Sequence, residues 1–512
     1  MAMFRLREHS TTVWVEVRGG LVTFLTLSYI LFVQPAILSG VGMPWGDVFF
    51  ATCVCSAIAC FLMGCLANYP FALAPAMGHN VFFAVTVCGT MGFVWPEALL
   101  ANLIAGGVFL FLSLFGLREA VMHAVPEGLK YAIAVGIGLL IAFVGLQYGG
   151  VVQANSSVLV GMGNLKSPVV LVTLAGIVVV AVLAALRLRG AILVGILATA
   201  AIALAASYWA RPAYPESRAV ECIPLGRLAE RRAAFDAGGS DPVKAVPRGE
   251  VRMILAELPE GWHMPSLPKE TFGAAVTKGV RLFRDHGLLE ILVVIFVFFF
   301  LDLFDTVGTL IGVSERAGFL DEKGRLPRAR QALFSDAVGT VTGALVGTST
   351  ITTYVESAAG ISSGARTGLA AIVTGMLLLL ALVFAPLVQM IGKGVQFIGP
   401  AGEPLVQVAA GTGDPVSYYP VIAPVLVIIG VMMMSSIRKI RWEDNTEAIP
   451  AFLTIVVMQF TLSITDGIAW GFISYAILKL VTGRARDIHW LVALFAVLFV
   501  GMYVGRAMVT HG

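Results

Sequence analysis

Runs of apolar residues, separated by short polar stretches, recur along almost the whole chain. A helix of about 20 apolar residues is long enough to cross a lipid bilayer. The pattern therefore predicts an all-α polytopic membrane protein. The predicted spans cover about 20–40, 48–68, 97–117, 127–147, 168–187, 190–208, 286–313, 332–347, 367–390, 418–436 and 488–506. Residues 449–482 are interrupted at Thr465-Asp466-Gly467, which favours two short helices over one.

Two further stretches are too short and too interrupted to be plain spanning helices. In residues 69–84, Pro70, Pro75 and Gly78 predict an extended piece followed by a half-helix that starts near Gly78. Residues 348–364 begin with β-branched and polar residues, which favour an extended strand, and continue with small residues that suit a helix. Counted along the chain, these are elements three and ten of fourteen, so they occupy corresponding positions in two halves of seven. Such a pair indicates the binding site of a transporter; the alternative for the second stretch is a loop.

The composition changes between 209 and 284, where Arg, Glu, Asp and Pro are frequent and no apolar run reaches spanning length. We expect an extramembrane insertion with two short amphipathic helices, at about 224–236 and 270–283. A solvated loop without chemistry is favoured over a regulatory or partner-binding surface. The boundaries that follow are 1–19 for the amino terminus, 20–208 for the first inverted repeat, 209–284 for the insertion and 285–512 for the second repeat.

Composition and charge agree with a membrane protein and indicate its orientation. Hydrophobic residues make up 58% of 512 and charged residues 13%, and the mean hydropathy is +0.89. The net charge of +3 lies in short loops and reports topology, not binding to nucleic acid. Lys and Arg fall on one side if the spans alternate, which predicts a multi-pass protein with a cytoplasmic amino terminus; the side of the carboxyl terminus stays open. The six cysteines are expected to be buried thiols and not metal ligands.

Two acids, Asp302 and Asp305, lie inside the predicted span 286–313. Their i, i+3 spacing places them on one face of a helix, which Thr306 extends. A charge at membrane depth costs at least a few kcal/mol, so such acids indicate a functional site. A helix that ends near Asp302, with both acids in water, is the alternative, but the apolar run continues past them. A third acid, Glu356, lies at the centre of element ten.

Several long motifs resemble those of the AzgA-like purine permeases in the nucleobase:cation symporter-2 family. The resemblance covers nearly the whole chain and is weak only in the insertion. The motifs that carry it, in the family's order, are Ala74–Ala84 (APAMGHNVFFA), Leu303–Leu310 (LFDTVGTL), Asp336–Thr340 (DAVGT) and Gly347–Gly360 (GTSTITTYVESAAG).

The resemblance implies about fourteen transmembrane segments in two inverted repeats of seven, with a core domain that carries substrate and a gate domain that often dimerises. It implies import of adenine, guanine and hypoxanthine by proton symport across the plasma membrane, which is the inner membrane in a bacterium. It also assigns residues: Asp302 and Glu356 match acids that contact the base, and Asp305 and Asn80 match positions important for activity. His79 departs from the family, which usually has an apolar residue there.

A neutral purine offers ring N–H donors and carbonyl or ring-nitrogen acceptors. A carboxylate can accept from a ring N–H, and backbone N–H groups of residues 80–83 and 356–359 are predicted to donate to a carbonyl. The predicted substrate-binding residues are Asp302, Glu356, Asn80, Phe82, Phe83, Thr306 and Tyr354, and the predicted supporting residues are Asp305, Thr353 and Ser357. Phe304 also offers a ring, although aromatic residues at this spacing more often pack in the core.

Proton coupling is expected from the same acids, because burial and a second acid nearby favour the protonated form of a carboxyl group. Asp302 or Glu356 is the expected carrier. His79 is either a relay, since imidazole titrates near neutrality, or a core histidine satisfied by backbone. The choice between proton and sodium, the preferred purine and the oligomeric state stay open.

Two other functions are weighed against purine transport. An inorganic-anion transporter can share the inverted-repeat plan, but acids would repel its substrate, and Lys and Arg are missing from elements three, eight and ten. An intramembrane aspartyl protease needs acids on separate helices in a Gly-x-Gly-Asp context, and neither Asp302 nor Asp305 lies in such a context. We therefore expect no enzyme activity, no cofactor and no metal, and we expect a purine, a proton and the lipid bilayer as partners.

Overall fold

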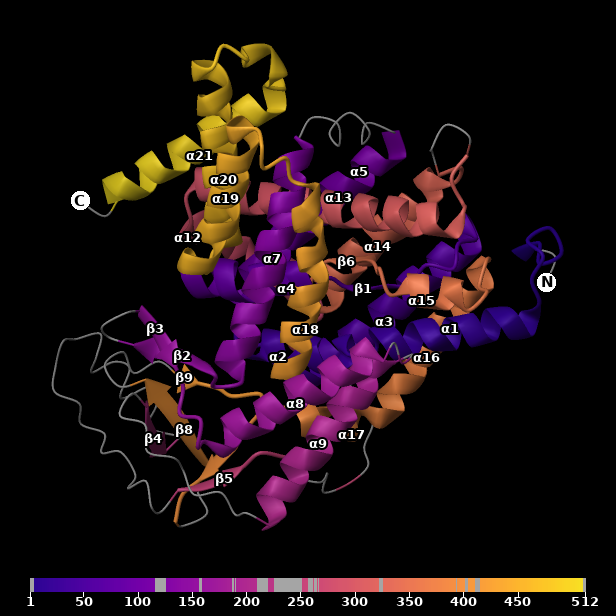
Figure 1. Ribbon diagram of the computed structural model, residues 1–512, viewed down its shortest axis with the longest axis vertical. Helices are drawn as coiled ribbons and strands as arrows, with labels where there is room; N and C mark the ends of the chain where they lie inside the picture. The colour runs from indigo at the N-terminus through magenta and orange to yellow at the C-terminus, as the bar shows by residue number, and fades with distance from the viewer. Residues whose placement is uncertain are drawn as a thin grey trace. The chain divides into compact units, whose positions relative to one another are not determined.

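The computed structural model describes residues 4–115, 126–155, 159–186, 188, 190–209, 220–224, 251–256, 261, 265, 267–321, 326–392, 394–400, 404–409 and 415–509 (Figure 1). The described residues are mostly helical. Contacts divide the chain into two compact units. The first consists of Met1–Ile141, Met264–Phe384 and Gly430–Gly512, and the second of Ala142–His263 and Ala385–Ile429. These units cut across the halves 20–208 and 285–512, which stay a prediction.

Most helices of the first unit overlap the predicted spans, although the first begins at Val13, ahead of the predicted start at 20, and the one predicted over 367–390 ends at Leu380. Helices α7 (Glu127–Tyr148) and α18 (Ala423–Met433) contribute to both units. The remaining helices of the first unit are α1 (Val13–Leu27), α2 (Ile30–Ser39), α3 (Trp45–Leu62), α4 (Met77–Val81), α5 (Trp95–Phe115), α11 (Ala274–Thr277), α12 (Leu282–Asp285), α13 (Leu288–Ala317), α14 (Ala329–Val346), α15 (Ser357–Ser362), α16 (Gly368–Leu380), α19 (Asn445–Thr461), α20 (Ile464–Val481) and α21 (Trp490–Val509).

Small residues let α3 and α16 approach closely within the first unit. A side chain on Gly64 would collide with the backbone of Gly368. The amino terminus of α16 is also held by an acid, because the buried carboxylate of Glu16 accepts from the N–H groups of Arg366 at 2.9 Å and Thr367 at 3.2 Å. These bonds satisfy donors that a helix start leaves unpaired.

Basic residues predicted to share the cytoplasmic side lie together at one end of this unit. The guanidinium of Arg18 donates to the carbonyl of Ser363 at 2.7 Å, and that of Arg366 donates to the carbonyl of Ile361 at 2.8 Å. Both therefore satisfy carbonyls at the carboxyl end of α15. Their proximity supports a shared side, while the orientation of the chain stays a prediction.

Residues 449–482 form two helices, α19 and α20, as predicted, but the break lies at Leu462 and Ser463, and Thr465-Asp466-Gly467 falls in the first turn of α20. The chain turns at Leu462, which has a φ of 51°, and the side chain of Ser463 accepts from the N–H of Asp466 at 3.2 Å as a helix cap.

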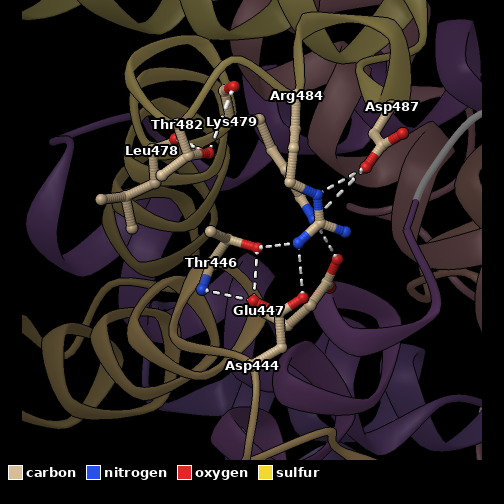
Figure 2. A network of polar contacts seen from close by, with 8 residues as sticks. All are labelled: Asp444, Thr446, Glu447, Leu478, Lys479, Thr482, Arg484 and Asp487. Carbon is tan, nitrogen blue, oxygen red and sulfur yellow. Dashed lines mark hydrogen bonds and ion pairs between the residues drawn. The ribbon is translucent and has the colours of Figure 1, made fainter.

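The open end of this helix pair carries a polar network (Figure 2). Arg484 donates to the carboxylate of Asp444 at 2.8 Å, so the outer ends of both helices lie on the same side. The hydroxyl of Thr446 and the guanidinium of Arg484 hold the pKa of Asp444 below its usual range. Beside them, the buried ammonium of Lys479 lies 2.9 Å from the carboxylate of Glu447.

The second unit combines helices with strands that the sequence did not predict. Strands β4, β8, β7 and β5 pair in that order, β9 pairs with β8, all these pairings are antiparallel, and β2 pairs with β3. The all-α prediction is therefore wrong in part. The elements are α8 (Pro168–Ala185), α9 (Ala191–Trp209), α17 (Ala385–Gly392), β2 (Val152–Asn155), β3 (Leu159–Met162), β4 (Val220–Pro224), β5 (Arg252–Ile254), β7 (Gln396–Ile398), β8 (Pro404–Ala409) and β9 (Pro415–Val416).

The insertion 209–284 supplies β4 and β5 to this sheet. The predicted helix 224–236 lies outside the described residues apart from Pro224. The predicted helix 270–283 is wrong: the chain forms the short helices α11 and α12, with a tighter turn at Gly279–Arg281 between them. Gly273, with a φ of 69°, and Lys278, with a φ of −102°, depart from helical geometry and break the run.

Seven stretches among the described residues are helical, long and apolar enough to cross a membrane. They are Val13–Ser39, Trp45–Ala67, Trp95–Ser113, Glu127–Tyr148, Pro168–Ala185, Gly368–Gly392 and Ile464–Val481. A multi-pass membrane protein is therefore confirmed, and the number of fourteen segments stays a prediction.

Candidate functional site

The two broken elements meet in the first unit as a short antiparallel strand pair, β1 (Leu73–Pro75) with β6 (Ile351–Thr353) (Figure 1). The hydrogen bonds continue past the strands, because the N–H of Ala76 donates to the carbonyl of Thr350 at 3.0 Å. Strand β1 leads into α4, which continues through wider π-helical turns to Thr90, and β6 leads into α15. The prediction of an extended piece followed by a half-helix is confirmed for both elements, and the structure places the two side by side.

Asp302 of α13 is almost fully buried and faces α14. Its carboxyl oxygens lie 3.4 Å from the hydroxyl of Thr306 and 3.3 Å from that of Thr340. Each hydroxyl has one proton and a closer acceptor: Thr306 lies 2.8 Å from Asp336, and Thr340 lies 3.1 Å from the carbonyl of Ile351. Asp302 and Asp336 therefore both contact the hydroxyl of Thr306.

Asp336 is a buried acid that sequence reasoning named only as part of a family motif and not as a site residue, although it lies inside a predicted span. Besides Thr306, its carboxylate accepts from the backbone N–H of Thr353 at 3.0 Å and from the hydroxyl of the same residue at 3.3 Å. Asp336 therefore joins α13 to the end of β6. Thr353, predicted as a supporting residue, makes supporting contacts, because it donates both bonds to Asp336. An acid in an apolar helix was the signal available in the sequence.

Asp305 lies in different surroundings from Asp302, although both are on α13. Its side chain is exposed, and it accepts from the hydroxyl of Thr352 at 3.3 Å. Its charge acts on Glu356 and Tyr354 at the start of α15. The structure therefore brings Asp305 close to the acid of element ten.

Glu356 is partly exposed, and one of its oxygens is held by a residue from the first span. The hydroxyl of Tyr29 donates to Oε1 of Glu356 at 2.9 Å. The ring of Tyr354 lies 6.3 Å from that of Tyr29, and its hydroxyl donates to the carbonyl of Pro75 in β1. Tyr29 carried no sequence signal of its own, because it lies in an ordinary apolar run.

Asn80 is fully buried at the back of the strand pair. Its carbonyl oxygen accepts from the hydroxyl of Ser349, which also accepts from the amide of Gln34 at 3.1 Å. The same amide donates to Thr348 at 2.8 Å, and Asn102 of α5 accepts from Thr350 at 2.6 Å. These side chains fix the residues that precede β6. Sequence reasoning missed Gln34 and Asn102, although both are polar residues in predicted spans.

The predicted aromatic contacts separate into two groups. Phe82 and Phe83 are fully buried and lie edge-on to Phe298, with ring centroids 4.7 and 6.3 Å apart. Their geometry is that of core packing. Phe304 is only partly buried, and the ammonium of Lys130 lies 5.1 Å from the centre of its ring.

His79 on α4 is almost fully buried, and neither ring nitrogen has a hydrogen-bond partner among the described residues. The ring is near the backbone of Phe298 without meeting hydrogen-bond geometry. Its contacts thus give no support to a proton relay.

The backbone N–H groups predicted as donors are largely occupied. The N–H of Asn80 donates to the carbonyl of Ala76, and those of Ser357 and Ala359 donate within their own turn of α15. Each of these three groups already completes a turn in this structure, and donation to a substrate carbonyl stays a prediction. The hydroxyl of Ser357 accepts from the N–H of Ala72 at 3.0 Å, which is a supporting contact between the two broken elements.

The chain has relatives of similar length in bacteria. It is 38% identical to the guanine/hypoxanthine permease PbuO of Bacillus subtilis (strain 168), over 97% of this chain and 98% of the relative. It is also 38% identical to the adenine permease AdeP of Escherichia coli (strain K12), over 97% of this chain and 94% of the relative. These relatives confirm the resemblance to AzgA-like purine permeases.

Among solved structures, the transmembrane domain of the cyanobacterial bicarbonate transporter BicA is similar in fold, with a TM-score of 0.52 at 14% identity. The similarity covers 89% of this chain and 96% of that domain. The profile of the Permease family (Xan_ur_permease) matches residues 16–224 and 277–401, and the chain belongs to this family of transporters, which are not enzymes.

Proposed function

We propose that this chain imports purine nucleobases, namely hypoxanthine, guanine and adenine, by proton symport across the plasma membrane. The observation that carries the proposal is the identity of 38% over 97% of the chain to permeases named for guanine/hypoxanthine and for adenine. The strand pair of β1 and β6, with acids beside it, supports a small polar substrate at this point.

Asp305 and Glu356 are the acids that we place at the substrate. The side chain of Asp305 is more exposed than those of Asp302 and Asp336, and that of Glu356 is partly exposed, which supports access of a ligand to both. A purine ring N–H that donates to a carboxylate forms a charge-assisted hydrogen bond, about twice as strong as a neutral one. The assignment of Asp302 to the substrate and Asp305 to support stays a prediction, and the contacts favour the opposite distribution of roles.

Asp302 is the acid that we place at the coupling proton, together with Asp336. Two buried carboxyl groups that share the hydroxyl of Thr306 cannot both be ionised cheaply, because like charges at low dielectric repel strongly. A proton held between them would be released when the surroundings change as the transporter turns over. Glu356, nearer to solvent, is the alternative carrier.

The remaining assignments follow from the family and from charge. We place the amino terminus in the cytoplasm, the chain in the inner membrane if the source is bacterial, and a second copy beside it as a homodimer. Arg18 and Arg366, which lie together at one end of the first unit, support the first of these.

An inorganic-anion transporter of the same fold is the weaker alternative. The similarity to BicA concerns the fold, and its 14% identity carries no substrate information. Asp305 and Glu356 would repel an anion at the point where the broken elements meet.

Uptake of radiolabelled hypoxanthine in a cell that lacks its own purine transport tests the proposal. We expect uptake that unlabelled purines inhibit and that a protonophore abolishes. Uptake that sulfate or bicarbonate inhibits, and purines do not, would contradict it. Uptake that survives the protonophore but needs sodium would support the purine substrate and refute proton coupling.

A further inference from the structure

The first membrane span is broken opposite Glu356. Helix α1 ends at Leu27 and α2 begins at Ile30, and the two residues between them are Ser28 and Tyr29. Here the backbone forms a tighter 3₁₀-type turn, in which the N–H of Leu31 donates to the carbonyl of Ser28, three residues earlier, at 3.1 Å.

Tyr29 is buried, with 3% of its surface exposed, and its hydroxyl lies 2.9 Å from Oε1 of Glu356. This distance is typical of a phenol that donates to a carboxylate. A bond of this kind is stronger to the ionised carboxylate than to the neutral acid, because the charge of the acceptor assists it. Tyr29 thus stabilises one protonation state of Glu356 over the other.

The position of Tyr29 relative to Glu356 is fixed by the packing of α1 against α15. A side chain on Gly360 would overlap the backbone of Gly19 and the hydroxyl of Thr23, so the two helices are in close contact. The guanidinium of Arg18 donates to the last turn of α15 at 2.7 Å. The phenol is therefore preorganised and does not depend on a flexible loop.

We propose that Tyr29 is a positioning residue of the transport site: it orients the carboxylate of Glu356 toward the purine and sets the pH at which this acid takes up its proton. The proposal rests on the function proposed above, with Glu356 as the residue that carries the proton. The other titratable groups that face Glu356 are Tyr354 at the end of β6 and Asp305 on α13. Tyr354 directs its own hydroxyl to the carbonyl of Pro75, so Tyr29 supplies the phenol donor.

The test compares Tyr29→Phe with Thr26→Val in the full-length protein, by hypoxanthine uptake at external pH values from 5 to 8. Tyr29→Phe removes only the hydroxyl that touches the carboxylate. Thr26 is the matched control, because its hydroxyl bonds mainly within α1, at 2.8 and 3.0 Å, and reaches only the backbone carbonyl of Glu356, at 3.5 Å.

We expect the pH of half-maximal uptake to rise by about one unit in Tyr29→Phe, because loss of the donor favours the protonated acid. The maximal rate should fall more than KM rises, since proton release becomes slower. Thr26→Val should keep the wild-type pH profile. A Tyr29→Phe profile that coincides with wild type, or an equal shift in Thr26→Val, would overturn the proposal.

If Tyr29→Phe is inactive in uptake, binding of tritiated hypoxanthine to the purified protein over the same pH range decides. If the pH of half-maximal binding is higher in Tyr29→Phe than in wild type, the positioning role is supported. If the pH of half-maximal binding is unchanged, the role is refuted. Failure of the proposed function is distinguishable, because wild-type uptake would then be indifferent to pH and to a protonophore. A defect confined to Tyr29→Phe leaves that function intact.

Discussion

Replacing Glu447 by Gln would leave the ammonium of Lys479 buried without its nearest acid. Only 1% of the Lys479 side chain and 16% of the Glu447 side chain are exposed, and the two charges are 2.9 Å apart. At that distance two unit charges attract by about 6 kcal/mol at an effective dielectric constant of about 20. Most of this offsets the cost of desolvation, but removal of one partner exposes that cost and typically lowers stability by about 3–5 kcal/mol.

A second acid recovers part of the loss. Asp487 lies 3.9 Å from the ammonium of Lys479, but 47% of its side chain is exposed (Figure 2). Water and salt screen such a pair, so Asp487 contributes about 1 kcal/mol or less. We therefore expect Glu447→Gln to lower the free energy of unfolding by about 3 kcal/mol.

The measurement is thermal unfolding of the purified protein in detergent. Glu8→Gln is the matched control, because it breaks the exposed pair with Arg5, at 3.5 Å, and should change stability by less than about 1 kcal/mol. The double variant Glu447→Leu, Lys479→Met leaves no unpaired charge and should be more stable than the single variant. A Glu447→Gln protein as stable as the Glu8→Gln protein, or a double variant below the single one, would refute the reasoning.

Three further outcomes are expected. Asp336→Asn should reduce hypoxanthine uptake at least about tenfold at normal protein levels, because an amide cannot replace the carboxylate that accepts from Thr306 and Thr353. The loss of a hydrogen bond to a charged acceptor costs about 1.5–3 kcal/mol. Full uptake by this variant would contradict the prediction. Thr446 and Arg484 lower the pKa of Asp444 in the folded protein. The stability that these contacts contribute is therefore fully present above the pKa of an unfolded Asp, about 3.9, and is lost as the pH falls toward the lower pKa of the folded protein. The difference in melting temperature between wild type and Asp444→Asn should therefore shrink below about pH 4, and a constant difference from pH 3 to 7 would argue against it. Gly347→Ala should reduce the amount of folded protein in the membrane, because φ there is 121° and a Cβ would overlap a neighbouring threonine; wild-type levels, measured by fluorescence-detected size exclusion, would disprove it.

The broken elements could be predicted because their signals are local. Proline and glycine in 69–84, and β-branched residues in 348–364, restrict the backbone whatever surrounds them. The pairing of β1 with β6 and the half-helices that follow agree with that expectation. The strands of the second unit were missed because they are short and lie among polar residues, where alternation is too brief to distinguish from a loop.

The surroundings of each acid could not be read from spacing. Asp302 and Asp305 share one face of a helix, but a step of three residues still leaves their side chains about 60° apart around the helix axis, enough for each to meet different neighbours. Which neighbour each acid meets depends on distant segments: Asp336 is 30 residues from Thr306, and Tyr29 is 327 residues from Glu356. Such contacts follow from packing between helices, which a single sequence does not state.

The measurement that tests the account most directly is hypoxanthine accumulation in proteoliposomes with an imposed pH gradient, acidic outside. For the wild-type protein we predict accumulation above the external concentration, which a protonophore collapses. For Glu356→Gln and Asp305→Asn, reconstituted at equal amounts, we predict no accumulation. Accumulation by both variants at the wild-type rate, or accumulation by the wild type without a gradient, would contradict the central claim that proton-driven purine uptake requires the acids beside the broken elements.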